Sequence, residues 1–149
     1  MSTPFESAQL NLQLFDLRRE AVLREARAWF LKEFNPESLD ELLQITRGEH
    51  NAWFRMVIGY WEMAASMVTT GAIDREAFLA AHGEILATFS KVYPFLSGLR
   101  EAVGEPKALQ HIEAVVMAEP NAGATFTRLR TGLIAMAKAQ KEEAAKTKN

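Results

Sequence analysis

The sequence predicts an all-α protein, a compact bundle of six or seven helices with a long helix at its N-terminal end. Apolar residues recur three and four positions apart over most of the chain, which is the spacing of amphipathic helices. Glycine and proline fall mostly between these segments, and residues that favour helix N-caps precede several of them. Leu10 to Leu14 alternates like a β-strand, but no second run offers it a partner.

The first helix is expected to begin at Thr3-Pro4-Phe5-Glu6, which supplies an N-cap hydroxyl, a proline at the first helical position and a glutamate at the third. The helical spacing continues until Asn35-Pro36 ends it, which gives a helix of about 28 residues. Its inward stripe is expected to contain Leu12, Phe15, Val22, Ala26 and Trp29.

A short helix is expected to follow from the capping box Ser38-Leu39-Asp40-Glu41 and to stop by Gly48. The next segment, His50 to Thr70, is the most apolar, and we expect it at the centre of the bundle. Gly71 ends it, and Asp74 caps another helix that continues to a break at Tyr93-Pro94.

Two short helices and one long helix are predicted for the rest of the chain. The short ones end at Val103 and span Pro106 to Val116, and Pro120-Asn121 opens the last helix. Apolar residues in that helix repeat as in a coiled coil, at Phe126, Leu129, Leu133 and Met136. The pattern then fades, so we expect one domain over residues 1–137 and a polar tail, frayed or disordered, over residues 138–149.

Composition excludes several classes of protein. A chain of 149 residues with 48% apolar residues and no cysteine is neither a disordered segment nor a disulfide-rich secreted module. Its net charge of −2 gives no basic field for nucleic acid, so no such partner is expected. No apolar run approaches the roughly 20 residues of a membrane-spanning helix. We expect no membrane span and a cytoplasmic location.

Motifs for metal, nucleotide or nucleophilic chemistry are also missing. The three histidines, His50, His82 and His111, form no His-x-x-x-His or Glu-x-x-His pair, so no metal site is expected. The glycines make no phosphate-binding loop, and no serine sits in a Gly-x-Ser-x-Gly turn. We expect no cofactor and no enzymatic activity.

One polar line on the central apolar helix is a candidate site. Its members are spaced three or four residues apart: Asn51, Arg55, Gly59, Glu62 and Ser66. The line can be the solvent edge of an amphipathic helix, or a buried ion pair with Arg100 or Glu113 that fixes helix register. It can also border a ligand pocket. Accordingly, a ligand or register site is predicted at Asn51, Arg55, Trp61 and Glu62.

Charge is distributed unevenly along the chain. Residues 33–119 carry six basic and thirteen acidic side chains, whereas residues 121–149 carry six basic and two acidic ones. The basic last helix is therefore expected to face the acidic middle, within one molecule or across a dimer.

A resemblance rests on three short segments, Tyr60-Trp61-Glu62-Met63-Ala64, Gly71-Ala72-Ile73-Asp74, and Tyr93-Pro94-Phe95 followed by Arg100. The stretch from about residue 53 to residue 105 resembles a family of uncharacterised bacterial helical domains. The resemblance implies an all-α bacterial fold and brings no activity with it.

The function predicted from these observations is a non-enzymatic helical scaffold or protein-interaction module. It is expected to self-associate through apolar helix faces as a homodimer, because large apolar patches are rarely left in water. An alternative is a small-molecule binding or sensor domain with a pocket near Trp61 and Glu62. A third hypothesis, an enzyme using Glu62 with Arg55 or a histidine as an acid–base pair, would need both groups within hydrogen-bond reach in a cleft.

Overall fold

The computed structural model describes residues 1–148, and this part of the chain is helical without a β-strand. The all-α prediction is confirmed, with more helices than the six or seven expected. In chain order the elements are α1 (Pro4–Arg18), α2 (Ala21–Lys32), α3 (Leu39–Arg47), α4 (Asn51–Thr69), α5 (Arg75–Ala81), α6 (Glu84–Val92), the 3₁₀ helix η1 (Tyr93–Phe95), α7 (Leu96–Val103), α8 (Gln110–Val116) and α9 (Ala122–Thr147).

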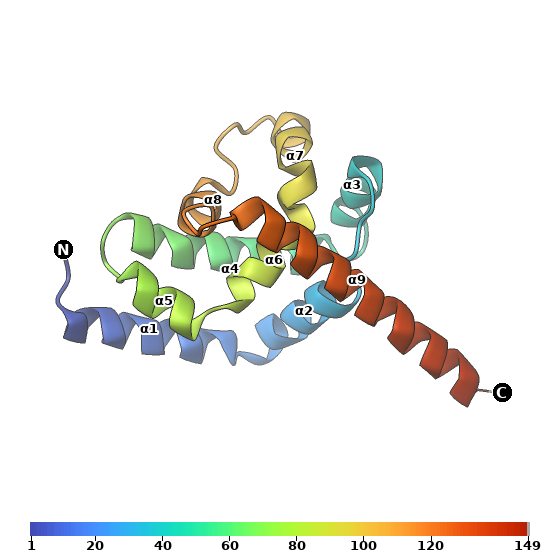
Figure 1. Ribbon diagram of the computed structural model, residues 1–149, viewed down its shortest axis with the longest axis horizontal. Coiled ribbons are helices and arrows are strands. Elements are labelled where there is room, and N and C mark those ends of the chain that lie inside the picture. Colours follow the sequence, from blue (N-terminus) through green and yellow to red (C-terminus); the bar gives the residue numbers. More distant parts are fainter. Residues whose placement is uncertain (149) are drawn as a thin grey trace.

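Helix α4 lies at the centre of the molecule, as its apolar sequence predicts. It packs against α2 on one side and α8 on the other, while α6 packs against α9 (Figure 1). Its buried side chains include Trp61, Ala64 and Ala65, which are fully shielded from solvent. The small alanines allow the neighbouring helices to approach α4 closely.

The predicted long N-terminal helix is wrong, because the chain breaks between α1 and α2. The carboxylate of Glu20 accepts hydrogen bonds from the backbone N–H groups of Val22 and Leu23, so a new helix starts there. The break separates the predicted inward stripe into two parts. After the break, Ala26 and Trp29 lie in the core but Val22, at the start of α2, is exposed; Leu12 and Phe15, before the break, are exposed as well.

A second predicted helix, from Asp74 to Tyr93, is also divided. Helix α5 ends at Ala81, and its C-cap residue His82 leads directly into Gly83 and α6. The last short helix begins later than expected, at Gln110, after Leu109 adopts a left-handed φ of 59°. Both differences arise where tertiary packing, rather than a proline, interrupts the helical spacing.

Helix α9 crosses the body and then extends beyond it (Figure 1). Its first half closes the core through Phe126, which stacks edge-to-face on Phe89 of α6. Further along, Met136 is exposed, and Lys138 forms an ion pair with Glu37 at 3.7 Å. Residues 138–147 of the predicted tail are helical, and Asn149 lies outside the described residues.

Within residues 1–148 no helix has both the length and the apolar character that crossing a lipid bilayer demands.

Candidate functional site

The four residues predicted as a ligand or register site do not converge on one cavity. Trp61 is fully buried and packs edge-to-face on Tyr60. Asn51 donates a side-chain hydrogen bond to the carbonyl of Thr46 at 2.5 Å, which ties the start of α4 to the end of α3. Arg55 lies exposed on the outer side of α4.

Glu62 has a structural task that its spacing along α4 does not reveal. Its two carboxylate oxygens accept hydrogen bonds from the backbone N–H groups of His111 and Ile112, each at 3.0 Å. These groups belong to the first turn of α8, whose own N-cap residue, Leu109, has no side-chain acceptor. Glu62 therefore caps a neighbouring helix and fixes the position of α8 on α4.

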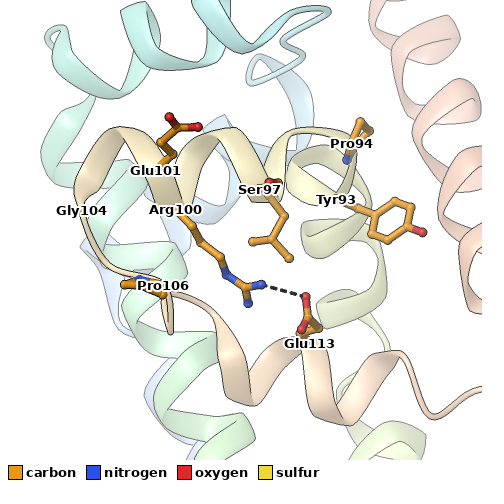
Figure 2. A pocket seen from close by; sticks show the side chains of 9 residues that line it. Tyr93, Pro94, Ser97, Arg100, Glu101, Gly104, Pro106 and Glu113 are labelled. Atoms are coloured by element: carbon orange, nitrogen blue, oxygen red, sulfur yellow. Dashed lines mark ion pairs between the residues drawn. The ribbon is translucent and has the colours of Figure 1, made fainter.

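Arg100 and Glu113, the partners considered for a buried ion pair, bind each other instead. Figure 2 shows their side chains facing one another from α7 and α8, with Arg100 Nη1 and Glu113 Oε2 separated by 3.3 Å. They line a cleft of about 770 Å³ together with Tyr93, Pro94 and Pro106. The two charges neutralise each other, and Arg100 Nε also donates to the carbonyl of Ala108 at 2.9 Å. Arg100 thus holds the turn between α7 and α8 in place.

Helix α1 has an unusual distribution of polar and apolar side chains. The face that it turns toward the body carries Ser7, which is buried, Asn11, whose Oδ1 is shielded from solvent, and Arg18, whose side chain is only 12% exposed. Leu14 is the one large apolar side chain of α1 that is fully buried. The exposed polar side chains of α1 include Gln9, Gln13 and Asp16, which lie on the far side of the helix from Ser7 and Arg18.

One exposed flank of α1 is apolar. Phe5, Ala8, Leu12 and Phe15 follow one another at spacings of three, four and three residues, and we call these four residues the α1 seam. Phe5 and Leu12 are each 70% exposed and Phe15 is 44% exposed. This spacing is that of the a and d positions of a coiled coil. Helix α5 packs against α1 but leaves these side chains in contact with solvent.

Polar contacts hold the inner face of α1 in place. The Tyr60 hydroxyl donates to the Leu14 carbonyl at 2.5 Å, and the Ser7 hydroxyl accepts from the Asp74 backbone N–H at 2.9 Å. Arg27 Nη1 donates to the Arg18 carbonyl at 3.0 Å. Burial raises the pKa of Tyr60 to about 12, so this hydroxyl keeps its proton and remains a donor at neutral pH. The contacts fix which face of α1 points outward.

An ion-pair cluster supports the C-terminal end of α1. Arg27 binds both carboxylate oxygens of Glu84, at 2.8 and 2.6 Å, and Arg18 lies 3.9 Å from the same carboxylate. The hydrogen bonds from Arg27 to Glu84 raise the pKa of Arg27. Arg18 also lies over the rings of Phe15 and Trp61, with its guanidinium carbon 4.9 and 5.7 Å from the ring centres. The cluster connects α1, α2, α4 and α6 at one point.

A pocket of about 880 Å³ opens beside the α1 seam. Pro4, Ala8 and Leu12 line it from α1, and Ile73 and Ala77 line it from the turn before α5 and from α5 itself. Two of these residues, Ala8 and Leu12, are also members of the α1 seam. The pocket therefore lies against one edge of the α1 seam, and its lining also includes the polar side chains of Ser7, Asn11 and Arg75.

The sequence indicated this apolar surface but did not indicate whether it faces the body of the protein or the solvent. The helical spacing of Leu12, Phe15 and Val22 was visible, and it predicted a face that packs against something. The spacing did not show that Leu12 and Phe15 face solvent, because Ser7 and Arg18, on an adjacent part of α1, are polar although they face the body. Neither Trp61 nor Glu62 lines this pocket or the cleft in Figure 2.

Comparison with known proteins identifies a family and no activity. No curated protein and no solved structure matches the chain. A family model described as a domain of unknown function (DUF4760) matches residues 4–118, which include α1 to α8 and end before α9. The resemblance seen in the middle of the sequence is confirmed over a longer range. The chain belongs to the DUF4760 family of domains of unknown function.

Proposed function

We propose that this protein is a helical interaction module that self-associates as a homodimer through the α1 seam. The observation that carries the proposal is the exposed apolar line on α1, where Phe5 and Leu12 are each 70% exposed and Phe15 is 44% exposed. Exposed apolar side chains in a continuous line are costly for a monomer and are typical of a surface that another molecule covers.

A second copy of this chain fits the α1 seam better than an unrelated partner does. A seam with alternating spacings of three and four residues packs well against an identical helix. Charges beside it do not oppose such a contact, because Asp16 and Arg19 pair with each other at 3.7 Å. Glu6 is occupied by the capping box with Thr3, where it accepts the backbone N–H at 2.7 Å. Two identical surfaces can therefore meet without unpaired like charges.

Small-molecule binding beside Trp61 and Glu62 remains a prediction without a cavity to support it. Trp61 is buried in the core, and both oxygens of Glu62 are used by α8. The charged groups in the cleft of Figure 2 are paired with one another. The exposed α1 seam is the stronger basis for a function.

The test compares two leucines of α1 that differ only in the face they occupy. Leu12 belongs to the α1 seam, whereas Leu17 is 52% exposed but lies off it. Light scattering and sedimentation equilibrium at micromolar concentration should show a dimer for the wild type and for Leu17→Glu. Leu12→Glu should be a monomer with an unchanged helical circular dichroism spectrum, because a charge in the seam must be desolvated on pairing. A monomeric wild type, or a dimeric Leu12→Glu variant, would contradict the proposal.

A further inference from the structure

We infer that the pocket between α1 and α5 binds a small, uncharged and mainly apolar molecule whose polar end is a hydroxyl group, held by Ser7 and Asn11 of α1. Three features select this chemistry: an apolar lining, two incompletely hydrogen-bonded polar side chains within it, and charged groups that are already paired. The inference does not depend on the proposed self-association.

The pocket has the size and the lining of a small-molecule site. Its volume of about 880 Å³ lies in the range of about 300–1,000 Å³ that such sites occupy. Helices α1 and α5 lie side by side (Figure 1), and the segment before α1 is tied to the turn between α4 and α5 by a hydrogen bond from the Ser2 hydroxyl to the Ala72 carbonyl, at 2.5 Å. The apolar residues of the lining include Pro4, Ala8, Leu12, Val68, Ile73 and Ala77. A wall of this kind favours a ligand with an apolar body.

Two polar side chains in this wall are shielded from water but incompletely hydrogen bonded. Ser7 is 3% exposed, and its hydroxyl accepts the backbone N–H of Asp74 at 2.9 Å while its own proton finds no acceptor within residues 1–148. Asn11 Oδ1 is buried and has no hydrogen-bond partner among the same residues. A buried acceptor without a partner costs free energy, which a bound donor recovers. The pair therefore suits a group that accepts from Ser7 and donates to Asn11.

The two side chains are close enough to bind one group. They lie one turn apart on α1, which separates the Cβ atoms of Ser7 and Asn11 by about 5–6 Å. An oxygen atom between them is within hydrogen-bond reach of both. The last torsion of an asparagine side chain is soft, so the amide can turn its oxygen toward the pocket. A hydroxyl group accepts and donates through one oxygen, whereas an ether oxygen only accepts.

The charged groups around the pocket have partners within the chain. Arg75 binds Glu119 at 2.8 Å and also donates to the carbonyl of Val115. A carboxylate oxygen of Asp74 accepts the backbone N–H of Ala77 at 2.9 Å. An anionic ligand would have to displace Glu119 from Arg75, or lose its hydration without gaining a counter-charge. The lining therefore favours an uncharged ligand over a fatty acid or a phosphate.

Binding of 1-octanol to the full-length chain tests the inference, with two-dimensional ¹H–¹⁵N NMR spectra as the readout. We expect octanol to cause saturable shifts of the amide signals of residues that line the pocket, such as Ile73 and Ala77. Octanoate has the same chain with a charged end and should bind roughly tenfold more weakly, or worse. Methyl octyl ether keeps the acceptor oxygen but lacks the donor, so it should bind about threefold more weakly, or worse.

Two substitutions with a matched control assign the binding to this pocket. Ala77→Trp fills the pocket from α5 and should weaken octanol binding by at least roughly tenfold, because the ligand and the indole compete for the same space. Ala80→Trp, at an exposed position of α5 outside the pocket, should leave it unchanged. Asn11→Leu keeps a similar volume but removes the acceptor, so this variant should bind octanol and the ether with equal affinity.

Several results would overturn the inference. One is the absence of saturable shifts with octanol, and another is octanoate binding as tight as octanol binding. Octanol binding that Ala77→Trp leaves unchanged would place the ligand outside the pocket, for example on the exposed α1 seam. An undiminished preference of Asn11→Leu for octanol over the ether would show that Asn11 does not bind the hydroxyl group. A monomeric wild type that binds octanol as expected would contradict the proposed self-association alone.

Discussion

The carboxylate of Glu62 supplies the cap that α8 cannot provide for itself. Two backbone N–H groups of α8 depend on it, those of His111 and Ile112. Unpaired N–H groups at a partly buried helix start would otherwise lose solvation without gaining a partner. One side chain of the central helix thus determines whether a helix far along the sequence begins in the right place.

Replacing Glu62 with glutamine tests this role. Glutamine keeps the length of the side chain but offers a single acceptor oxygen and no charge, so one of the two bonds to α8 is lost. We expect Glu62→Gln to lower the free energy of unfolding by about 1–2 kcal/mol in urea denaturation. Glu101→Gln, at an exposed position on α7, should change it by less than about 0.5 kcal/mol. Equal stability of both variants would show that Glu62 is not needed as a cap.

Lys91 shows why some side chains resist prediction from sequence. It is 1% exposed, and its Nζ donates to the carbonyls of Phe30 and Leu31 near the end of α2, each at 2.7 Å. Burial lowers its pKa to about 8. A lysine on a helix is usually solvent-exposed, and the burial of Lys91 depends on how α6 packs against the end of α2, which spacing along the chain does not show.

At the scale of elements, helix starts were predictable where a capping side chain is close in sequence. Thr3, Ser38 and Asp74 each accept the expected hydrogen bond from a backbone N–H three residues later. The two breaks inside predicted helices were missed for a related reason. One uses Glu20, which is a weak N-cap signal, and the other places His82 at the end of α5 because of the packing around it.

His82, at the break between α5 and α6, is expected to make the free energy of unfolding depend on pH. His82 is fully buried, and neither ring nitrogen has a hydrogen-bond partner within residues 1–148. Burial and the charge of Arg18 lower its pKa below the usual value of 6.5, although the Asn11 backbone and Glu84 act in the opposite direction. The unfolded chain therefore binds a proton at this residue at a higher pH than the folded chain does.

The sign of the effect follows from this difference in proton binding. Well above pH 6.5 His82 is neutral in both states, and as the pH falls through that value the unfolded state gains protons first. We expect the free energy of unfolding to fall as the pH drops below about 6.5. His82→Phe should show a shallower decline from pH 7 to pH 5, whereas His111→Gln should keep the wild-type decline. Urea denaturation at pH 7 and pH 5 measures the difference, and equal slopes for wild type and His82→Phe would refute it.

For the whole molecule, the periodicity of the sequence predicted the fold class and the central helix, and it placed the candidate site on α4 and not on the exposed α1 seam. Spacing identifies which side chains share a face, and it does not say whether that face meets the body or another molecule. Leu12 and Phe15 were therefore expected in the core, and Glu62 was considered for a site although it serves as a cap.

Helix α9 raises the question of where the folded unit ends. The family match stops at residue 118, yet Phe126 of α9 is 1% exposed and packs against Phe89 and Tyr93. The first half of α9 thus belongs to the core of this protein, whereas residues after Met136 lie beyond it (Figure 1).

Shortening the chain should leave the stability of the protein unchanged, whereas substituting Phe126 should lower it. A chain of residues 1–137 is expected to keep the thermal stability of the full-length protein, because it loses only the exposed Lys138–Glu37 ion pair from the body. Phe126→Ala should lower the free energy of unfolding by about 3–4 kcal/mol through the cavity it leaves. Met136→Ala, at a 60% exposed position, serves as the matched control and should be neutral. A large loss of stability on shortening would place the domain boundary later in α9.

The way in which α1 is attached to the body affects local unfolding of the protein. Hydrogen bonds to Tyr60, Asp74 and Arg27 hold this helix on the body. Leu14 is its one fully buried large apolar side chain. Such a helix detaches at a lower free-energy cost than the interior of the bundle. If its outer side is covered only when chains meet, the order of the first eighteen residues rises and falls with protein concentration, and amide hydrogen exchange there becomes a measure of assembly.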